Sequence, residues 1–213
     1  MVHIINIGNA SLYAPELDQA YQLRHRVFVE ERGWECLRSA NGRDIDQFDN
    51  GCAVHVLLIE RDQVVGYSRL LPTTKPHLLT DVYPQLAQRP IPRGEEVFEW
   101  SRYCISREKR GDGIIGNTGS QLLYDVMGYA LMEGITRLTM QTDPIWITRF
   151  LDFGLSVEAL GLPQDFGGEL AVALSIGISD TALAQCRRML RVKSLHLQSR
   201  GTPRRAICRS VVA

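Results

Sequence analysis

The segment 120–133 constrains the fold most, because it predicts a helix that is apolar on nearly every side. Its apolar positions are Leu122, Leu123, Val126, Met127, Tyr129, Ala130 and Leu131. A helix of this kind lies buried inside a protein rather than on its surface. The chain has 213 residues, which is long enough to bury such a helix in the core of a single domain.

The rest of the chain predicts a mixed α/β sheet. Strands are expected at residues 2–7, 53–60, 64–71, 96–105, 135–141 and 170–178, and helices at 15–29, 120–133 and 144–153. Residues 61–63 would form the turn of a hairpin. This order of elements indicates a single sheet with helices on its faces. We expect one α/β domain over residues 1–185 and a basic C-terminal tail over 186–213.

The charges balance over the whole chain but not along it. Lys and Arg number 24, as do Asp and Glu, which disfavours a globally basic nucleic-acid binder. Eight basic residues follow the last acid, Asp180: Arg187, Arg188, Arg191, Lys193, Arg200, Arg204, Arg205 and Arg209. The tail is interpreted as a solvated, partly frayed terminus, or as a segment that contacts an acidic partner, phosphate or the body of the protein.

Cysteine and histidine usage indicates no metal site. The five cysteines, Cys36, Cys52, Cys104, Cys186 and Cys208, include no C-x-x-C pair, and the five histidines are scattered. The chain shows no signal-peptide pattern at its start and no apolar run long enough to span a membrane. We therefore expect a reduced cytoplasmic protein without a membrane partner.

An irregular segment, residues 30–50, is the first candidate site. It contains Asp44, Asp46 and Asp49 close in sequence to Phe28 and Trp34. Carboxylates beside aromatic faces suit a cationic small molecule, because both favour positive charge. An acidic surface loop with Asx-turns explains the same residues.

A second candidate pair lies in the strand expected at 96–105. Glu99 and Arg102 are charged residues among apolar neighbours. Strand alternation puts them on opposite faces unless a bulge intervenes, and a buried charge needs a partner. The pair is either structural or functional.

A glycine-containing basic loop, residues 107–113, precedes the buried helix. Such a loop can bind a pyrophosphate through backbone N–H groups. Its place between a strand and a helix resembles the acyl-CoA site of the GNAT acetyltransferases, whose pattern is Q/R-x-x-G-x-G/A. Glu108 stands here at the first position of that pattern.

The order of motifs along the chain resembles a specific relative of that fold, the LuxI-type acyl-homoserine-lactone synthases, which make quorum-sensing signals. The resemblance runs from about Tyr21 to about Ile178. It rests on Arg24-x-x-Val27-Phe28, Glu31-x-Gly33-Trp34, Asp46-Gln47-Phe48-Asp49, Gly66-x-x-Arg69-Leu70, Pro72-Thr73-Thr74 and Glu99-x-Ser101-Arg102.

The resemblance implies a reaction and its two substrates. The family joins the amine of S-adenosylmethionine (SAM) to an acyl thioester, then closes the product to a lactone and releases methylthioadenosine. It implies no cofactor besides these substrates and no metal, because a sulfonium is already a good leaving group.

The resemblance also implies roles for individual residues. Glu99 would be the general base that takes a proton from the amine. Arg102 and Asp46 complete the expected catalytic set. The residues expected to bind SAM are Arg24, Phe28, Trp34, Asp46, Asp49, Arg69 and Arg102.

The acyl donor is expected to lie against the second half of the chain. A backbone N–H near Ile105 would stabilise the thioester oxyanion, and Arg107, Arg110, Gly111 and Gly113 would bind the donor's phosphates. The acyl group would contact Met140, Thr142, Trp146 and Phe150. For these last four, a position in the core explains the sequence equally well.

Further motifs resemble the subgroup that uses acyl-CoA with short branched or aryl groups: Pro72-Thr73-Thr74-x-Pro76, Asp81-Val82-x-Pro84-Gln85-Leu86 and Gly161-Leu162-Pro163-Gln164-Asp165. Bulky Trp146 and Phe150 would shorten an acyl tunnel. Acyl-CoA is therefore the expected donor. The alternatives are acyl carrier protein, a conventional GNAT amine acetyltransferase, and a non-catalytic regulator that contacts nucleic acid through the basic tail.

Overall fold

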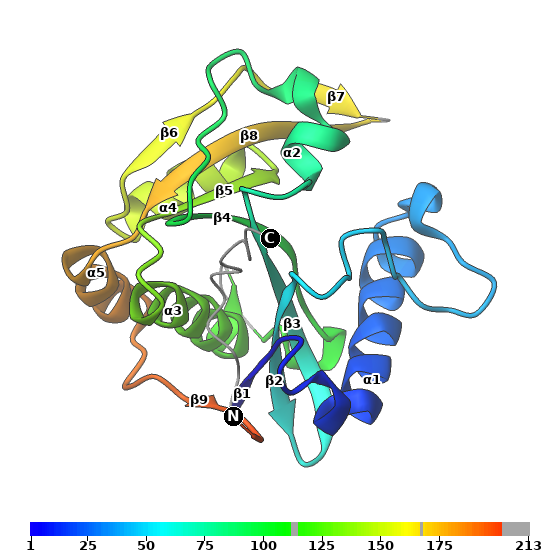
Figure 1. The fold of residues 1–213 in the computed structure, drawn as a ribbon. Helices are drawn as coiled ribbons and strands as arrows, with labels where there is room; N and C mark the ends of the chain where they lie inside the picture. Colours follow the sequence, from blue (N-terminus) through cyan, green and yellow to red (C-terminus); the bar gives the residue numbers. More distant parts are fainter. Residues whose placement is uncertain (112–114, 167, 202–213) are drawn as a thin grey trace, which may run out of the picture. The chain divides into compact units, whose positions relative to one another are not determined.

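The computed structural model describes residues 1–111, 115–166 and 168–201. The chain forms two compact units (Figure 1). Unit 1 comprises Met1–Arg69, Arg102–Val126 and the segment that begins at Leu195, and unit 2 comprises Leu70–Ser101 and Met127–Ser194. Strands β3 (Gln63–Pro72) and β4 (Val97–Ile105) and helix α3 (Gly116–Met132) contribute residues to both units.

The sheet of unit 1 is built on a hairpin. Its strand order is β9-β1-β2-β3, with β1 at Val2–Ile5, β2 at Val54–Glu60 and β9 at Leu197–Gln198. Strand β1 is antiparallel to β2 and parallel to β9. The turn between β2 and β3 has only two residues, Arg61 and Asp62, with φ of 48° and 62°. Positive φ at both positions is typical of a type I′ turn, which matches the twist of the paired strands.

Helix α1 (Ala14–His25) has Pro15 in its first turn and packs on this sheet. Its buried residues Ala20 and Leu23 share a core with Leu57, Val64 and Tyr67 of the hairpin. The chain continues as a π-helix over Arg26–Glu31, so the helix expected at 15–29 changes type near its end. Single π-helical turns occur often at functional sites.

Unit 2 contains the strand order β6-β8-β5-β4, with β7 paired to β8. These strands are β5 (Arg137–Thr142), β6 (Val157–Ala159), β7 (Gln164–Phe166) and β8 (Glu169–Gly177). Strand β8 is antiparallel to its neighbours, whereas β4 and β5 are parallel with a register that covers Val97–Glu99. The helices of unit 2 are α2 (Leu78–Asp81), α4 (Ile145–Asp152) and α5 (Asp180–Leu190).

At Gly161 in unit 2 the backbone lies very close to the backbone of Leu86. A Cβ at this position would lie 2.2 Å from the carbonyl oxygen of Leu86. The neighbouring Leu160 carbonyl accepts hydrogen bonds from the backbone N–H groups of Gln88 and Arg89. Only glycine allows this approach, which explains the glycine of the Gly161-Leu162-Pro163 motif.

The structure confirms the expected sheet and helices and adds elements that the sequence did not reveal. The order of strands and helices agrees with the expectation, while α2, α5, β6, β7 and β9 were not expected. The expected boundary at residue 185 lies inside α5, which runs from Asp180 to Leu190. The division into one domain over residues 1–185 and a tail over 186–213 stays a prediction.

The basic C-terminal segment contacts unit 1 as far as it is described. Strand β9 pairs with β1, and Arg200 forms an ion pair of 2.6 Å with Glu16. The Arg200 guanidinium also lies 4.9 Å from the ring centre of Tyr13. Of the four alternatives for the tail, contact with the body describes residues 195–201. Arg204, Arg205, Cys208 and Arg209 lie outside the described residues.

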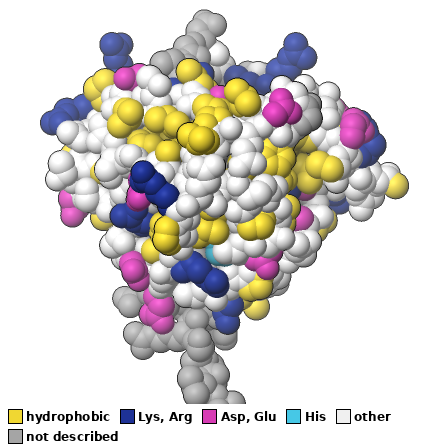
Figure 2. Space-filling model, turned by 90° about the horizontal axis from the view of Figure 1, so that it is seen from above, with side chains coloured by type: hydrophobic (Ala, Val, Ile, Leu, Met, Phe, Trp, Pro, Cys, Tyr) yellow, Lys and Arg dark blue, Asp and Glu magenta, His cyan; other side chains and the backbone are white. Residues whose placement is uncertain are grey.

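Several large apolar side chains are exposed, among them Val82, Leu162 and Leu170 of unit 2. Figure 2 shows hydrophobic side chains interspersed with separate charged ones on one face. Within the described ranges, no helix is both long and apolar enough to cross a membrane. Cys36, Cys104 and Cys186 are free thiols.

Candidate active site

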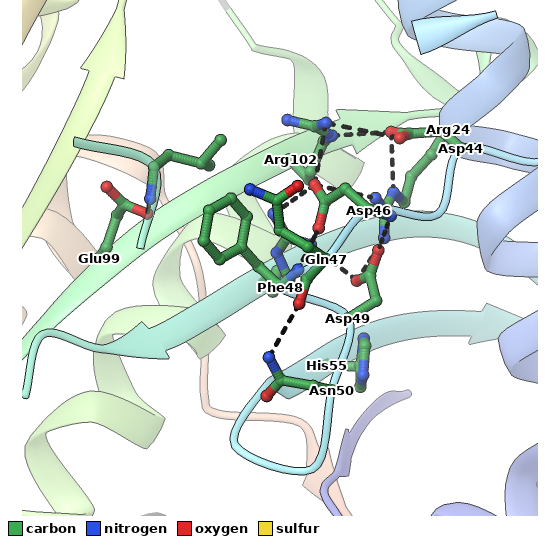
Figure 3. A network of polar contacts seen from close by, with 12 residues as sticks. Arg24, Asp44, Asp46, Gln47, Phe48, Asp49, Asn50, His55, Glu99 and Arg102 are labelled. Carbon is green, nitrogen blue, oxygen red and sulfur yellow. Dashed lines mark hydrogen bonds and ion pairs between the residues drawn. The ribbon is translucent and has the colours of Figure 1, made fainter. Parts of the chain in front are cut away.

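Six charged side chains meet in unit 1, and we call them the arginine–aspartate cluster. Its cations come from helix α1, strand β3 and strand β4, and its anions from the irregular loop: Arg24, Arg69, Arg102, Asp44, Asp46 and Asp49. In Figure 3 the labelled guanidinium groups of Arg24 and Arg102 point toward the three carboxylates. The charges of three arginines and three aspartates cancel.

Arg24 and Arg69 are both fully buried and share Asp49. The Nη1 atoms of both arginines donate to Asp49 Oδ1 at 2.8 Å. Arg24 Nε donates to Asp44 Oδ2 at 3.0 Å. Arg69 also bonds both oxygens of Asp46, at 2.6 and 3.0 Å. Bidentate pairs of this kind fix both the position and the orientation of the carboxylate.

Arg102 bridges Asp44 and Asp46 of the loop. Its Nε donates to Asp44 Oδ2 at 2.7 Å and its Nη2 to Asp46 Oδ2 at 3.1 Å. The backbone of Arg102 has φ of 56°, a left-handed conformation inside a strand. This conformation is strained for a residue other than glycine and is found mainly at functional sites. It also breaks the alternation along β4, which is the irregularity that the sequence analysis left open.

The cluster keeps its aspartates ionised. Burial raises the pKa of Asp44, but the guanidinium groups of Arg102 and Arg24 outweigh burial and lower it below its usual value. The same balance, with Arg24 and Arg69 as the cations, lowers the pKa of Asp49 strongly. Opposite charges at hydrogen-bond distance favour the charged form. The loop is therefore locked to the strands at neutral pH.

The three aspartates differ in exposure. The side chains of Asp44 and Asp49 are 2% and 0% exposed, whereas that of Asp46 is 17% exposed. Asp46 Oδ1 and Asp49 Oδ2 also accept the backbone N–H groups of Phe48 and Asp46, at 2.9 Å each. All three aspartates fix the loop through the arginines, and Asp46 is the one that also keeps an exposed part.

Two residues bonded to the cluster, Tyr67 and His55, were not among the expected site residues, and Asp44 was expected only as part of the irregular segment. Arg24 Nη1 donates to the Tyr67 hydroxyl at 3.3 Å, and that hydroxyl lies 2.7 Å from His55 Nδ1. Burial lowers the pKa of His55 to about 4, so the imidazole is neutral and can accept from Tyr67. Tyr67 and Arg69 are two residues apart on β3. This spacing alone predicts that their side chains lie on the same face of the strand.

An aromatic pair lies beside the cluster. The rings of Phe28 and Trp34 are stacked, with centroids 5.1 Å apart and an interplanar angle of 15°. The guanidinium of Arg102 lies 5.7 Å from the Phe28 ring centre, and that of Arg32 lies 5.6 Å from the Trp34 ring centre. The two rings therefore contact the guanidinium cations of Arg32 and Arg102, and a sulfonium would interact with aromatic rings in the same way.

Arg24 retains an unused donor. Its Nη2 atom is buried and has no hydrogen-bond partner among the described residues, and it lies 3.9 Å from Asp46 Oδ2. A buried guanidinium N–H is suited to a carboxylate of a bound molecule.

Glu99 belongs to unit 2, where it is fully buried. Its two oxygens accept the backbone N–H groups of Leu78 and Leu79, at 2.8 and 2.7 Å, at the start of α2. Gln141 Nε2 donates to the same carboxylate at 2.7 Å. Burial raises the pKa of Glu99 despite these donors. If Glu99 were structural, an arginine partner was expected. Its carboxylate instead accepts from two backbone N–H groups and the Gln141 amide.

The loop expected to bind the donor's phosphates is partly occupied by other contacts. Arg110 forms an ion pair of 2.6 Å with Glu31, and its Nε donates to the Ile105 carbonyl at 3.0 Å. Arg107 makes no ion pair with the described residues and is exposed. Gly111 adopts φ of 61°. Gly113 lies outside the described residues.

The residues expected to contact the acyl group gather in unit 2 around an aromatic cluster. The ring of Phe150 lies 5.2 Å from that of Trp146 and 6.2 Å from that of Trp100, which the sequence analysis had not singled out. Met140 and Phe150 are buried, while Thr142 and Trp146 are half-buried. This burial is consistent with residues that only pack in the core and also with residues that contact an acyl group.

Comparison with known proteins gives first the class of fold. A Lactobacillus plantarum structure assigned as an N-acetyltransferase matches with a TM-score of 0.54 at 23% identity, over 84% of this chain and 99% of that chain. This likeness shows the fold alone, a mixed α/β sheet with helices of the GNAT type.

The chain belongs to the autoinducer synthase family, whose profile matches residues 9–186. The isovaleryl-homoserine lactone synthase of Bradyrhizobium diazoefficiens is 38% identical over 179 residues, which are 84% of this chain and 80% of that protein. It follows that the chain is an acyl-homoserine-lactone synthase and that the resemblance of its motifs is confirmed.

Two solved structures are similar over almost the whole chain. One is a CoA-dependent acyl-homoserine lactone synthase, BjaI, with SAM and isopentyl-CoA, at a TM-score of 0.90 and 35% identity, covering 98% of this chain and 97% of that one. Another is the CoA-dependent acyl-homoserine lactone synthase MesI, at a TM-score of 0.84 and 28% identity, covering 92% and 98%.

Proposed function

We propose that this enzyme joins a short branched or aryl acyl group from acyl-CoA to the amine of SAM and closes the product to an N-acyl-homoserine lactone. The observation that carries the proposal is the likeness to the synthase solved with SAM and isopentyl-CoA, which extends over 98% of the chain. The same protein has also been solved with MTA, the abbreviation for methylthioadenosine.

The arginine–aspartate cluster supports binding of SAM. Asp46 is the carboxylate with an exposed part, so it is proposed to face the cationic end of SAM, and the stacked Phe28 and Trp34 are proposed to contact the sulfonium and adenosyl region. The buried, unpaired Nη2 of Arg24 would donate to the carboxylate of the methionine part. Asp49, Arg69 and Arg102 would hold these groups in place.

The reaction consists of two displacements. The amine nitrogen attacks the thioester carbonyl, a C–N bond forms, and the C–S bond to CoA breaks. A carboxylate oxygen of the methionine part then attacks the carbon next to the sulfonium, and the C–S bond to methylthioadenosine breaks. Glu99 is proposed to take the proton that the ammonium must lose before its nitrogen can attack.

Two sets of residues are proposed to act on the acyl donor. Arg107, Arg110, Gly111 and Gly113 would bind the CoA phosphates, and a backbone N–H near Ile105 would stabilise the oxyanion. Bulky Trp146 and Phe150 would limit the length of the acyl group next to Met140 and Thr142. We also propose that the enzyme acts in the cytoplasm, where SAM and acyl-CoA are made.

The test is to incubate the purified enzyme with SAM and a panel of donors, and to measure lactone and methylthioadenosine by mass spectrometry. Isovaleryl-CoA or an aryl-CoA should give both products, and a long-chain acyl-CoA should give less. Equal turnover with isovaleryl acyl carrier protein would contradict the CoA assignment. An acylated amine formed without methylthioadenosine would indicate a simple acetyltransferase instead.

A further inference from the structure

His77 is a fully buried histidine of unit 2 that the proposed mechanism has not used. It directly precedes helix α2, and its Nδ1 lies 2.8 Å from the carbonyl oxygen of Lys75. A carbonyl oxygen can only accept, so Nδ1 carries the proton of this hydrogen bond. In the tautomer with its single proton on Nδ1, Nε2 carries a lone pair.

That lone pair is unusual because it is buried without a partner. Nε2 of His77 has no hydrogen-bond partner among the described residues. Most buried polar atoms are hydrogen-bonded, since an unmade bond leaves the cost of desolvation uncompensated. The ring cannot simply turn to relieve this, because Nδ1 is also 3.2 Å from the Thr80 hydroxyl and is fixed on that side.

His77 is tied to Glu99 by the backbone between them. The two residues that follow His77, Leu78 and Leu79, donate their N–H groups to the Glu99 carboxylate. A positive charge on His77 would lower the pKa of Glu99, so the ring and the carboxylate lie within electrostatic range of each other. The other charged group beside His77 is Asp81, whose Oδ2 accepts the His77 backbone N–H at 3.0 Å.

A second unpaired polar atom lies next to Glu99. Thr139 on β5 is the register partner of Glu99 on β4, so the two side chains share one face of the sheet. The Thr139 hydroxyl is buried and has no hydrogen-bond partner among the described residues. Gln141, two residues further along β5, uses its amide on Glu99. One buried polar atom without a partner thus belongs to the register partner of Glu99, and another to the residue that precedes the two N–H donors of its carboxylate.

We propose that His77 Nε2 accepts a hydrogen bond from the ammonium group of the substrate while Glu99 takes one of its protons, with the Thr139 hydroxyl as a further polar contact. This inference rests on the proposed function, in which Glu99 is the general base. One N–H bond of the ammonium breaks and one O–H bond forms on Glu99, leaving a neutral amine. In this role His77 accepts through Nε2 and orients the lone pair of the amine nitrogen.

The first test observes the imidazole directly in the intact protein. The enzyme is labelled with ¹⁵N-histidine, and the His77 signals are assigned by their loss in His77→Phe. We expect the tautomer protonated on Nδ1 and a shift of the Nε2 resonance when SAM is added without acyl donor. A ring protonated on Nε2, or an Nε2 resonance that saturating SAM leaves unchanged, would overturn the proposal.

The second test is kinetic. His77→Phe keeps a buried ring but removes the acceptor, and it should lower kcat/KM for SAM about 10- to 100-fold with little change in KM for acyl-CoA. His77→Gln places an amide oxygen near the position of Nε2 and should recover part of the loss. His3→Phe, at a partly buried histidine bonded to Tyr13, is the matched control and should retain the wild-type value.

Calorimetry and kinetics together distinguish a wrong role for His77 from a wrong proposed function. Calorimetry on the labelled sample shows whether SAM binds, and a protein that does not bind SAM refutes the function rather than the histidine. If SAM binds and is turned over but His77→Phe retains the wild-type kcat/KM, the role of His77 is refuted. If His77→Gln is no better than a folded His77→Phe, the effect is one of packing and the hydrogen bond is again refuted.

Discussion

At the scale of residues, the three aspartates of the loop have separate tasks although they stand within six positions of one another. Asp44 and Asp49 are buried and saturated by arginines, whereas Asp46 keeps an exposed part. Removing a buried partner leaves an uncompensated guanidinium, which costs about 3 to 5 kcal/mol. Removing the Asp46 carboxylate affects what binds at its exposed part and also weakens its bonds to Arg69 and Arg102.

The first prediction separates these tasks. Asp46→Asn should weaken SAM binding roughly 10- to 100-fold, because a charge-assisted contact contributes about 1.5 to 3 kcal/mol. Calorimetry with SAM measures this. Asp49→Asn is the comparison, and its main effect should be a lower melting temperature. An unchanged dissociation constant in a folded Asp46→Asn protein would make Asp46 a loop-fixing residue only.

The second prediction concerns Glu99→Gln. If Glu99 accepts the amine proton, kcat should fall roughly 10²- to 10⁴-fold, and higher pH should restore part of the rate by supplying free amine. The variant also places an NH₂ group toward the N–H groups of Leu78 or Leu79, so some stability is lost as well. Single-turnover rate and melting temperature are measured on one sample. A folded variant with the wild-type rate would refute the general-base role.

At the scale of elements, the loop after β4 contains basic residues in different situations. Arg110 is paired with Glu31 and Lys109 with Glu60, at 2.6 and 2.7 Å. Arg107 has no ion pair with the described residues. Within this loop Arg107 is therefore the cation most available to a phosphate, although the sequence alone treats the three alike.

The third prediction follows from that difference. Arg107→Glu should raise KM for acyl-CoA about 3- to 10-fold and leave KM for SAM nearly unchanged, because an exposed ion contact contributes up to about 1 kcal/mol. Arg110→Glu should also disturb the contact with Glu31 and lower the melting temperature. Lys193→Glu, the same charge change at an exposed position of the tail, is the control. An equal rise in KM for the control would indicate general electrostatic attraction instead of a phosphate contact.

At the scale of the whole molecule, a buried histidine couples folding to pH. Burial lowers the pKa of His55 from 6.5 to about 4 in the folded protein. Between these values the unfolded chain binds the additional proton, so stability rises as pH increases from 4 to 6.5 and is complete above that range. Asp44 and Asp49, whose pKa values are lowered, act in a separate window below 3.8.

The fourth prediction is that His55→Phe flattens this dependence. The wild-type free energy of unfolding should fall by about 3 kcal/mol between the upper and lower ends of that window because of His55. The variant loses the bond to Tyr67 and is less stable at neutral pH, but its decline should be smaller by that amount. Urea unfolding at several pH values within the window measures both slopes. Parallel curves would show that another group controls the acid sensitivity.

How much the sequence predicts depends on the range of the interactions involved. The hairpin over β2 and β3, helix α3 and strand β5 follow from periodicity, a local property. Helix α5 was missed because eight basic residues after Asp180 indicated a tail, although Ser179 accepts the Ala182 N–H as an N-cap. Strand β9 has only two residues and depends on β1, almost 200 positions away in the chain, so no local pattern indicates it.

For the site, the sequence by itself determined which residue types are present and in what order, and that order identified the family. Only the tertiary structure decided which carboxylate pairs with which arginine, because Arg24, Arg69 and Arg102 come from three elements that are distant in sequence. It also decided that Glu99 accepts backbone N–H groups instead of an arginine, and that Nε2 of His77 is buried without a hydrogen-bond partner among the described residues. The physical reason is that burial and hydrogen-bond geometry arise from long-range packing, whereas composition and spacing report only what each short segment favours.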